Sequence, residues 1–148
     1  MGEVLVAQGK LQEALETYQQ SLAILKRLAE QDKTNFSRQR DLSVSYEKVG
    51  DVLVAQGKLQ EALKAYQQIL KIRQTLAKQD KTNSGWQRDL IVTLYKVGTT
   101  TAEIGGKHNV TQAQGFLRAG LALVDKYSGL DRQQLVDALN QALQQLLH

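Results

Sequence analysis

Apolar residues recur along this chain at steps of three and four positions, the spacing that places them on one face of an α-helix. Between residues 11 and 31 this stripe consists of Leu11, Ala14, Leu15, Tyr18, Leu22, Leu25 and Leu28. The same spacing predicts further helices over about 38–56, 59–79, 86–104, 110–127 and 132–147. Gly9-Lys10 and Gly57-Lys58 are the expected turns, because glycine ends a helix easily. β-Rich runs are lacking, so the pattern predicts an all-α fold.

A long stretch of sequence occurs twice. Residues 2–15 and 50–63 differ only at Glu3 against Asp51, and the two copies lie 50 − 2 = 48 positions apart. Gln31–Asn35 reappears as Gln79–Asn83, and a weaker echo of the glycine stands at Gly98. Self-similarity at a fixed period of this size indicates an array of structural repeats.

The period divides the chain into four parts. Residues 1–33 form a partial first repeat, 37–81 a second, 86–127 a third, and 130–147 a helix that caps the array. The third repeat carries an insertion of three residues, since Gly105 to Ala113 spans 8 positions and Gly57 to Ala62 spans 5. The first repeat lacks its front turns, so either a longer array precedes it or another chain covers its end.

Composition excludes several classes of function. The chain has 148 residues with no Cys, and His108 and His148 lack the spacing of metal ligands. We therefore expect no enzyme, no metal and no cofactor. The net charge of +4 is mild and mixed in sign, which argues against a nucleic-acid partner. Without a long apolar run or a signal-peptide pattern, no membrane association and a cytoplasmic location are expected.

In the middle repeat a fixed order of aromatic, apolar, small and turn positions is formed by Tyr46, Val49, Gly50, Leu53, Gly57, Ala62, Tyr66 and Ile69. This pattern resembles that of the tetratricopeptide repeat (TPR) family. The first repeat matches at Gly2, Leu5, Gly9, Ala14 and Tyr18, and the third at Leu94, Val97, Gly98, Thr101, Gly105, Ala113, Leu117 and Gly120. The period of 48 exceeds the family's 34, and the longer helices are similar to those of kinesin-light-chain-like members. The resemblance implies a right-handed α-solenoid of antiparallel helix pairs that acts as a non-catalytic scaffold.

In such a solenoid the front helices line a concave groove that takes a partner's peptide or helix. The resemblance places in it Glu3, Val6, Val44, Glu47, Asp51, Val54, Val92, Tyr95, Thr99 and Glu103. The Lys and Asn with which some members hold a C-terminal carboxylate are replaced here by Glu47 with Asp51 and by Tyr95 with Thr99.

The four acids of this set form an expected acidic strip, Glu3, Glu47, Asp51 and Glu103. Such a strip favours a partner segment carrying Lys or Arg. The same acids are also compatible with ordinary solvated helix positions. Tyr95 is expected either as an exposed anchor for the partner or as a residue buried against the insertion or the capping helix.

Two functions follow from these observations. The first is a protein-interaction scaffold that binds a protein or peptide partner in the groove. The alternative is a self-associating array in which the incomplete first repeat mediates homo-oligomerisation. Its apolar residues Leu5, Leu11, Leu15, Tyr18 and Leu22 would otherwise leave an uncovered end.

Overall fold

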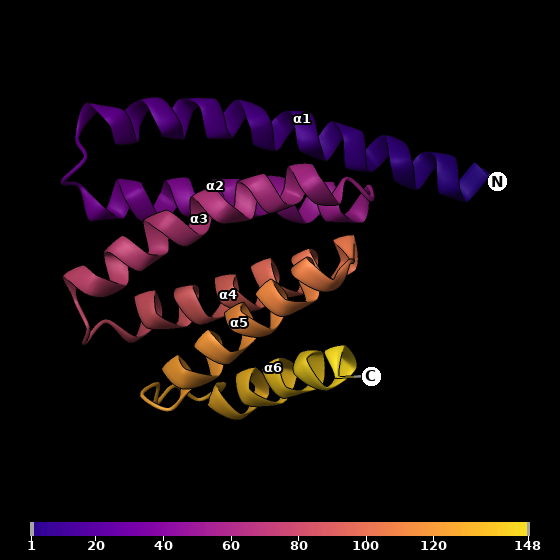
Figure 1. Cartoon of the computed structure of the whole chain (residues 1–148). Coiled ribbons are helices and arrows are strands. Elements are labelled where there is room, and N and C mark those ends of the chain that lie inside the picture. The colour runs from indigo at the N-terminus through magenta and orange to yellow at the C-terminus, as the bar shows by residue number, and fades with distance from the viewer. Residues whose placement is uncertain (1, 148) are drawn as a thin grey trace. The chain divides into compact units, whose positions relative to one another are not determined.

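The computed structural model describes the backbone of residues 2–147 and the side chains of residues 7–147. Over that range it consists of six helices and no strand: α1 (Gly2–Gln31), α2 (Phe36–Ala55), α3 (Leu59–Gln79), α4 (Ser84–Ile104), α5 (Lys107–Val124) and α6 (Arg132–Leu146) (Figure 1). The all-α helical repeat class predicted from the sequence is confirmed. The chain divides into two compact units, Met1–Ile72 and Arg73–His148, and the boundary between them falls within the sequence of α3. The predicted right-handed superhelix spans both units and stays a prediction.

The duplicated connection builds the start of α2 and of α4 in the same way. Asp32 accepts hydrogen bonds from the backbone N–H and the hydroxyl of Thr34, and Asp80 accepts the same pair from Thr82. Asn35 then caps α2 by accepting from the N–H of Arg38. An amide at this position satisfies one of the helix's unpaired N–H groups. Asn83 accepts in the same way from Trp86. The caps place both helix starts two residues earlier than the apolar pattern alone predicted.

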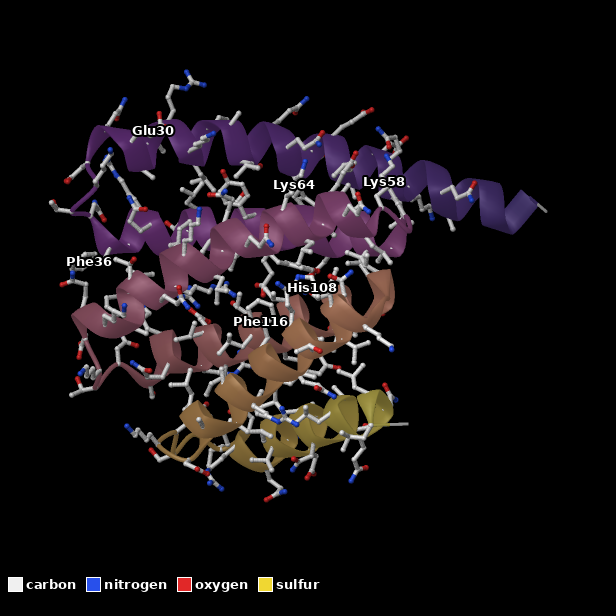
Figure 2. All side chains as sticks on the ribbon, in the orientation of Figure 1. Glu30, Phe36, Lys58, Lys64, His108 and Phe116 are labelled. Carbon is white, nitrogen blue, oxygen red and sulfur yellow. The ribbon has the colours of Figure 1, made fainter. Side chains whose placement is uncertain are left out.

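Gly57 ends α2 as predicted. Its φ of +78° lies in the left-handed region, which glycine enters at little cost. The N–H of Lys58 donates to the carbonyl of Leu53, and the N–H of Gly57 to that of Val54. This pair of bonds is the Schellman motif, which satisfies the last carbonyls of a helix. Lys58 therefore stands in the turn that reverses the chain into α3 (Figure 2).

The prediction of a turn at Gly9-Lys10 was wrong. α1 runs without interruption from Gly2 to Gln31, and Gly9 is not among the glycines with positive φ. The second copy of this sequence turns because 20 residues of α2 precede it and can pack back on α3. Within α1 the seven residues Gly2–Gln8 precede Gly9, too few for a helix that is stable by itself. Continuing the helix instead satisfies their backbone groups.

In the first unit α1 packs antiparallel to α2. Near one end of the pair Gln39 donates to the carbonyl of Ala29, and near the other Gln56 donates to the side chain of Gln12. The turns of α1 that precede this second contact project past the end of α2 (Figure 1). Residues 7–10 there are exposed.

Glycine sets the distance between the helices of a repeat. A Cβ added at Gly50 would lie 2.6 Å from Cε1 of Tyr66, so only glycine allows α2 to approach the ring of α3 this closely. The hydroxyl of Tyr66 donates to Asp51 at 2.5 Å. The next repeat has the same arrangement, since a Cβ added at Gly98 would meet Cγ and Cδ2 of Leu117 at 2.9 Å. Close packing of the neighbouring helix therefore explains why glycine recurs at positions 50 and 98.

In the second unit α5 packs against α4, and α6 packs against both. The buried side chains at their centre are Ile91, Leu117, Val124, Tyr127 and Leu139. A longer turn over residues 105–109 was expected from the insertion, and this was wrong, because α5 begins at Lys107, two residues after Gly105. The three extra residues instead form nearly one additional helical turn at the start of α5. Ala113 remains fully buried at the place of Ala62.

The second unit also buries a charge. Arg73 is 2% exposed, and its Nη1 donates to the hydroxyl of Thr93 at 2.9 Å. That hydroxyl donates in turn to the backbone carbonyl of Asp89, another buried residue. Buried charges are retained where they are hydrogen-bonded. Arg73 thus links the last turns of α3 to α4 within this unit.

Candidate partner-binding site

A pocket opens in the second unit where α4 faces α6. Its volume is about 330 Å³. Its lining consists of Tyr95, Thr99, Ala102 and Glu103 from α4, Leu117 from α5, and Ala142, Gln145 and Leu146 from α6. Tyr95, Thr99 and Glu103 are three residues that the sequence assigned to the concave groove. The structure brings them together within one hollow.

The four α4 residues line one hollow because they follow helical periodicity. Positions 95, 99, 102 and 103 are separated by steps of four, three and one, which gather on one face of a helix. The opposite face carries Leu90, Leu94, Val97 and Thr101, all buried. Thr99 donates its hydroxyl to the carbonyl of Tyr95, so it contributes a methyl group to the pocket.

Three polar side chains of the pocket form no polar contact with the rest of the described chain. Tyr95 is half-buried, Glu103 and Gln145 are exposed, and their side chains form no hydrogen bond or ion pair with any other described residue. Leu146, Ala102 and Ala142 supply the apolar surface beside them, and the fully buried Leu117 lies beneath it. An apolar wall with a few convergent polar groups is the usual form of a recognition pocket.

Tyr95 is half-buried in the second unit, and its expected role as an anchor for a partner stays a prediction. It packs against the core cluster of the second unit, alongside Leu143 and Leu146 of α6, and it also lines the open pocket. The capping helix therefore holds the ring from one side while the other side remains accessible. Such a restrained aromatic ring loses little side-chain entropy when a partner binds.

The candidate groove residues of the first unit differ from one another in exposure and contacts. Val44, Glu47 and Val54 are half-buried on α2. Asp51 is exposed, but its carboxylate already accepts the hydroxyl of Tyr66. Glu3 and Val6 lie outside the residues whose side chains the structure describes. The acidic strip would join residues of both units, so its continuity remains a prediction.

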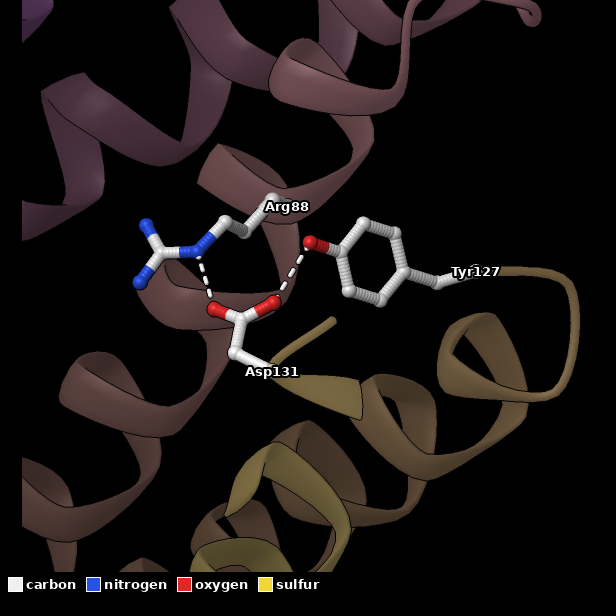
Figure 3. A network of polar contacts seen from close by, with 3 residues as sticks. All are labelled: Arg88, Tyr127 and Asp131. Atoms are coloured by element: carbon white, nitrogen blue, oxygen red, sulfur yellow. Dashed lines mark hydrogen bonds and ion pairs between the residues drawn. The ribbon is translucent and has the colours of Figure 1, made fainter. Parts of the chain in front are cut away.

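A second polar cluster fixes the start of α6. Asp131 accepts from Nε of Arg88 at 2.5 Å and from the hydroxyl of Tyr127 at 2.6 Å (Figure 3). The bond from Tyr127, followed by that from Arg88, lowers the pKa of Asp131. The same contacts raise the pKa values of Arg88 and Tyr127. This cluster joins α4, the end of α5 and α6, the elements that form the pocket.

Sequence reasoning missed the α6 side of the site. Ala142, Gln145 and Leu146 were assigned to a helix whose function was to cap the array. The groove was sought only on front helices, following the family resemblance. A usable signal was nonetheless present, because Leu146 continues the inward stripe of α6 two turns beyond Leu139. Leu117 was expected only as a core residue.

Two further findings concern the described part of the chain. No helix there is long and apolar enough to cross a membrane. Among the same residues no group of three or more His, Asp or Glu side chains could hold a metal ion.

The fold defines an all-α helical repeat protein. Comparison with protein-family models identifies a tetratricopeptide repeat at residues 1–32 and another at residues 43–80. The chain therefore carries repeats of the tetratricopeptide type. Repeats of this family generally mediate protein–protein interaction, and the family is a non-enzymatic scaffold family. No curated protein and no solved structure matches the chain. The likeness to kinesin-light-chain members stays a prediction.

Proposed function

We propose that this protein is a non-catalytic scaffold whose pocket between α4 and α6 binds a segment of a protein partner. The partner segment carries an apolar residue next to a Lys or Arg. This proposal rests on one observation: the pocket has an apolar wall, and beside it three polar side chains form no hydrogen bond or ion pair with other described residues. These are Tyr95, Glu103 and Gln145.

The chemistry of the pocket favours a basic residue over an acidic one. Glu103 supplies the only charge among the lining side chains, and it is negative. The alkyl stem of a Lys or Arg can lie on Leu146 and Ala142 while its charged end reaches the carboxylate. The ring of Tyr95 adds a face that attracts cations. An acidic residue would meet a like charge and find no basic lining group.

The size of the pocket suits one or two side chains rather than a whole helix. A volume of about 330 Å³ lies at the lower end of the range for small-molecule sites. A partner helix or extended segment would therefore insert an anchor here and make its other contacts along α4. Val92, one turn before Tyr95 and half-buried, is the next groove candidate on that helix.

A peptide panel tests this proposal. Short peptides that pair Leu with Lys or Arg are compared with the same peptides carrying Glu, by fluorescence anisotropy with the intact chain. We expect the basic set to bind, and Glu103→Lys to weaken that binding about tenfold, as expected for one partly desolvated charge contact. Preference for the Glu peptides would contradict the proposal.

The matched control is Glu61→Lys. Glu61 is an exposed acid in the first turn of α3, far along the sequence from the pocket residues. The variant makes the same change of net charge as Glu103→Lys. Equal loss of binding in both variants would mean that peptides respond to total charge and not to the pocket.

The second candidate function is self-association through the N-terminal repeat. The observation that favours it is the exposure of large apolar side chains on α1, where Ile24 is 54% exposed and Leu28 is 36% exposed. Leu76, which is the copy of Leu28 one period later, is only 2% exposed. α1 thus presents an apolar face that the corresponding part of α3 keeps covered.

A further inference from the structure

We propose that the pocket between α4 and α6 binds α1 of a second copy of this chain. The contact is formed by Ile24, Arg27 and Leu28 of that copy. This inference rests on the proposed function and names the partner for it. It follows from the exposed face of α1, from the charge of the pocket, and from the places where the repeats differ in sequence.

One face of α1 exposes an apolar pair with a free cation beside it. Ile24 is 54% exposed and Leu28 is 36% exposed. Arg27 stands three positions after the first and one before the second, so the three side chains gather on one side of the helix. The guanidinium of Arg27 is exposed and forms no hydrogen bond or ion pair with any other described residue, the nearby Glu30 included. Anchors spaced in this way are the form in which a helix enters a groove of its partner.

The other exposed large apolar side chains of the described residues lack such a cation. They are Phe36, Leu130 and Leu147. The first two are followed by Arg38 and Arg132, and each of these donates to a backbone carbonyl. Leu147 has no cation beside it, because α6 carries no Lys or Arg after its first residue. Only the α1 face therefore combines two apolar anchors with a free positive charge.

The pocket offers the matching surface. Glu103 is its one charged lining residue, and its carboxylate makes no bond with the rest of the described chain. The α4 side of the pocket runs from Tyr95 to Glu103, a rise of about 12 Å. Ile24 and Leu28 are separated by about 6 Å along their helix. Both anchors can therefore lie on the apolar wall while Arg27 reaches the carboxylate of Glu103.

Both charges of this contact stand where the repeats differ. One period after Arg27 the chain has Thr75, and one period before Glu103 it has Ala55. The α3 face that corresponds to Arg27 is also closed, since Leu76, at the place of Leu28, is only 2% exposed. The charge pair thus selects α1 over α3 as the inserted helix. It likewise selects α4 over α2 as the receiving helix.

The two surfaces of the contact are different, which decides the kind of assembly. Ile24 and Leu28 remain exposed in the single chain, and the pocket is lined by α4, α5 and α6 alone. Contacts between unlike surfaces either close into a ring or reciprocal pair, or continue as an open chain of copies. One small contact falls below the standard size of a stable interface. We therefore expect association that rises with concentration, with a dissociation constant of about 10 μM or weaker.

A charge exchange between two variants tests the contact directly. Arg27→Glu places two acids opposite each other, and Glu103→Lys places two cations opposite each other. We expect either variant alone to associate about tenfold more weakly than the unmodified chain in sedimentation. An equimolar mixture of the two should regain the lost affinity, because every pocket then finds an α1 of opposite charge. Failure of the mixture to regain it would overturn the proposal.

Two matched controls separate this contact from general association. Lys26→Glu makes the same charge change on α1 at an exposed position about 100° around the helix from Arg27, and we expect less than a twofold effect. Leu28→Gln should weaken association several-fold, whereas Leu130→Gln, at a fully exposed leucine of the second unit, should leave it within twofold. Equal losses within either pair would contradict the assigned face.

Peptide competition distinguishes failure of this inference from failure of the proposed function. The peptides that pair Leu with Lys or Arg should dissociate the assembled chain, and the Glu peptides should not. Binding of the basic peptides to a chain that stays monomeric at high concentration would overturn the inference and leave the pocket's function standing. Association that is insensitive to these peptides and to both charge variants would place self-association on another face and overturn the inference as well.

Discussion

Asp131 occupies the residue position before α6, where a short acidic side chain ordinarily caps a helix by accepting from its first N–H groups. Its carboxylate makes no such bond and instead accepts from Arg88 and Tyr127. The sequence predicted that Ser128 or Asp131 would cap the helix, because either residue type can do so. The distant Arg88 was not foreseeable as a partner, since 43 residues separate it from Asp131.

This cluster predicts a pH-dependent contribution to stability. The two donors lower the folded-state pKa of Asp131 below its unfolded value, which is about 3.9. The carboxylate's contribution is therefore fully present above that unfolded value and is lost as pH falls through the folded pKa. We expect Asp131→Asn to lower the free energy of unfolding at pH 7, and the gap to the unmodified protein to narrow in acid. Urea denaturation across this pH range measures both.

Asp137→Asn is the control for that prediction. Asp137 lies exposed on α6 and accepts a hydrogen bond from Gln133 within the same helix. The Asp137→Asn substitution removes one negative charge from α6, as Asp131→Asn does, but leaves the contacts of Arg88 and Tyr127 intact. If the gap to the unmodified protein depended on pH equally in both variants, the cluster around Asp131 would not be its source.

At the scale of the element, one sequence adopts two conformations. Gln8-Gly9-Lys10 lies within α1, whereas the identical Gln56-Gly57-Lys58 forms the turn between α2 and α3. Most of the helices could be predicted from apolar spacing, because burial of one face decides where they form. The outcome at Gly9 could not, because it depends on how much helix precedes the glycine and not on the glycine itself.

The two glycines should therefore respond to alanine in opposite directions. Gly9→Ala places a methyl group in a helix with no atom within 4 Å, and we expect a gain of about 0.5–1 kcal/mol. Gly57→Ala forces a side chain into φ +78°, and we expect a loss of about 1–2 kcal/mol. Urea unfolding of both variants under identical conditions measures the difference. Destabilisation by Gly9→Ala would show that the turn forms at Gly9 in solution.

The candidate site marks the other limit of prediction from sequence. Tyr95, Thr99 and Glu103 could be assigned to one face of a helix from their spacing and from the family pattern. The partners that turn this face into a pocket, Gln145 and Leu146, lie more than 40 residues further on. Their approach is decided by how α6 packs on α4 and α5, which no local pattern encodes.

At the scale of the whole molecule, the 48-residue period makes the protein an array whose repeats support their neighbours. Such arrays are stable roughly in proportion to the contacts each repeat makes with the next. α4 is enclosed by α5 and α6 in its own unit and holds fully buried residues such as Ile91 and Val97. α1 has α2 on one side, and residues 7–10 have no cover at all. Local stability should therefore fall toward the N-terminal end.

Hydrogen exchange resolved by residue tests this gradient in the native protein. At low concentration we expect the amides of residues 2–10 to exchange almost without protection and those of 90–98 to be the slowest, because exchange reports the local opening free energy. If the chain self-associates through its N-terminal repeat, exchange over α1 should slow at high concentration and exchange over residues 90–98 should stay unchanged. Uniform slowing along the chain would point to general association instead. Equal protection of α1 and α4 at low concentration would contradict the gradient, since it would require a cover for α1 within the single chain.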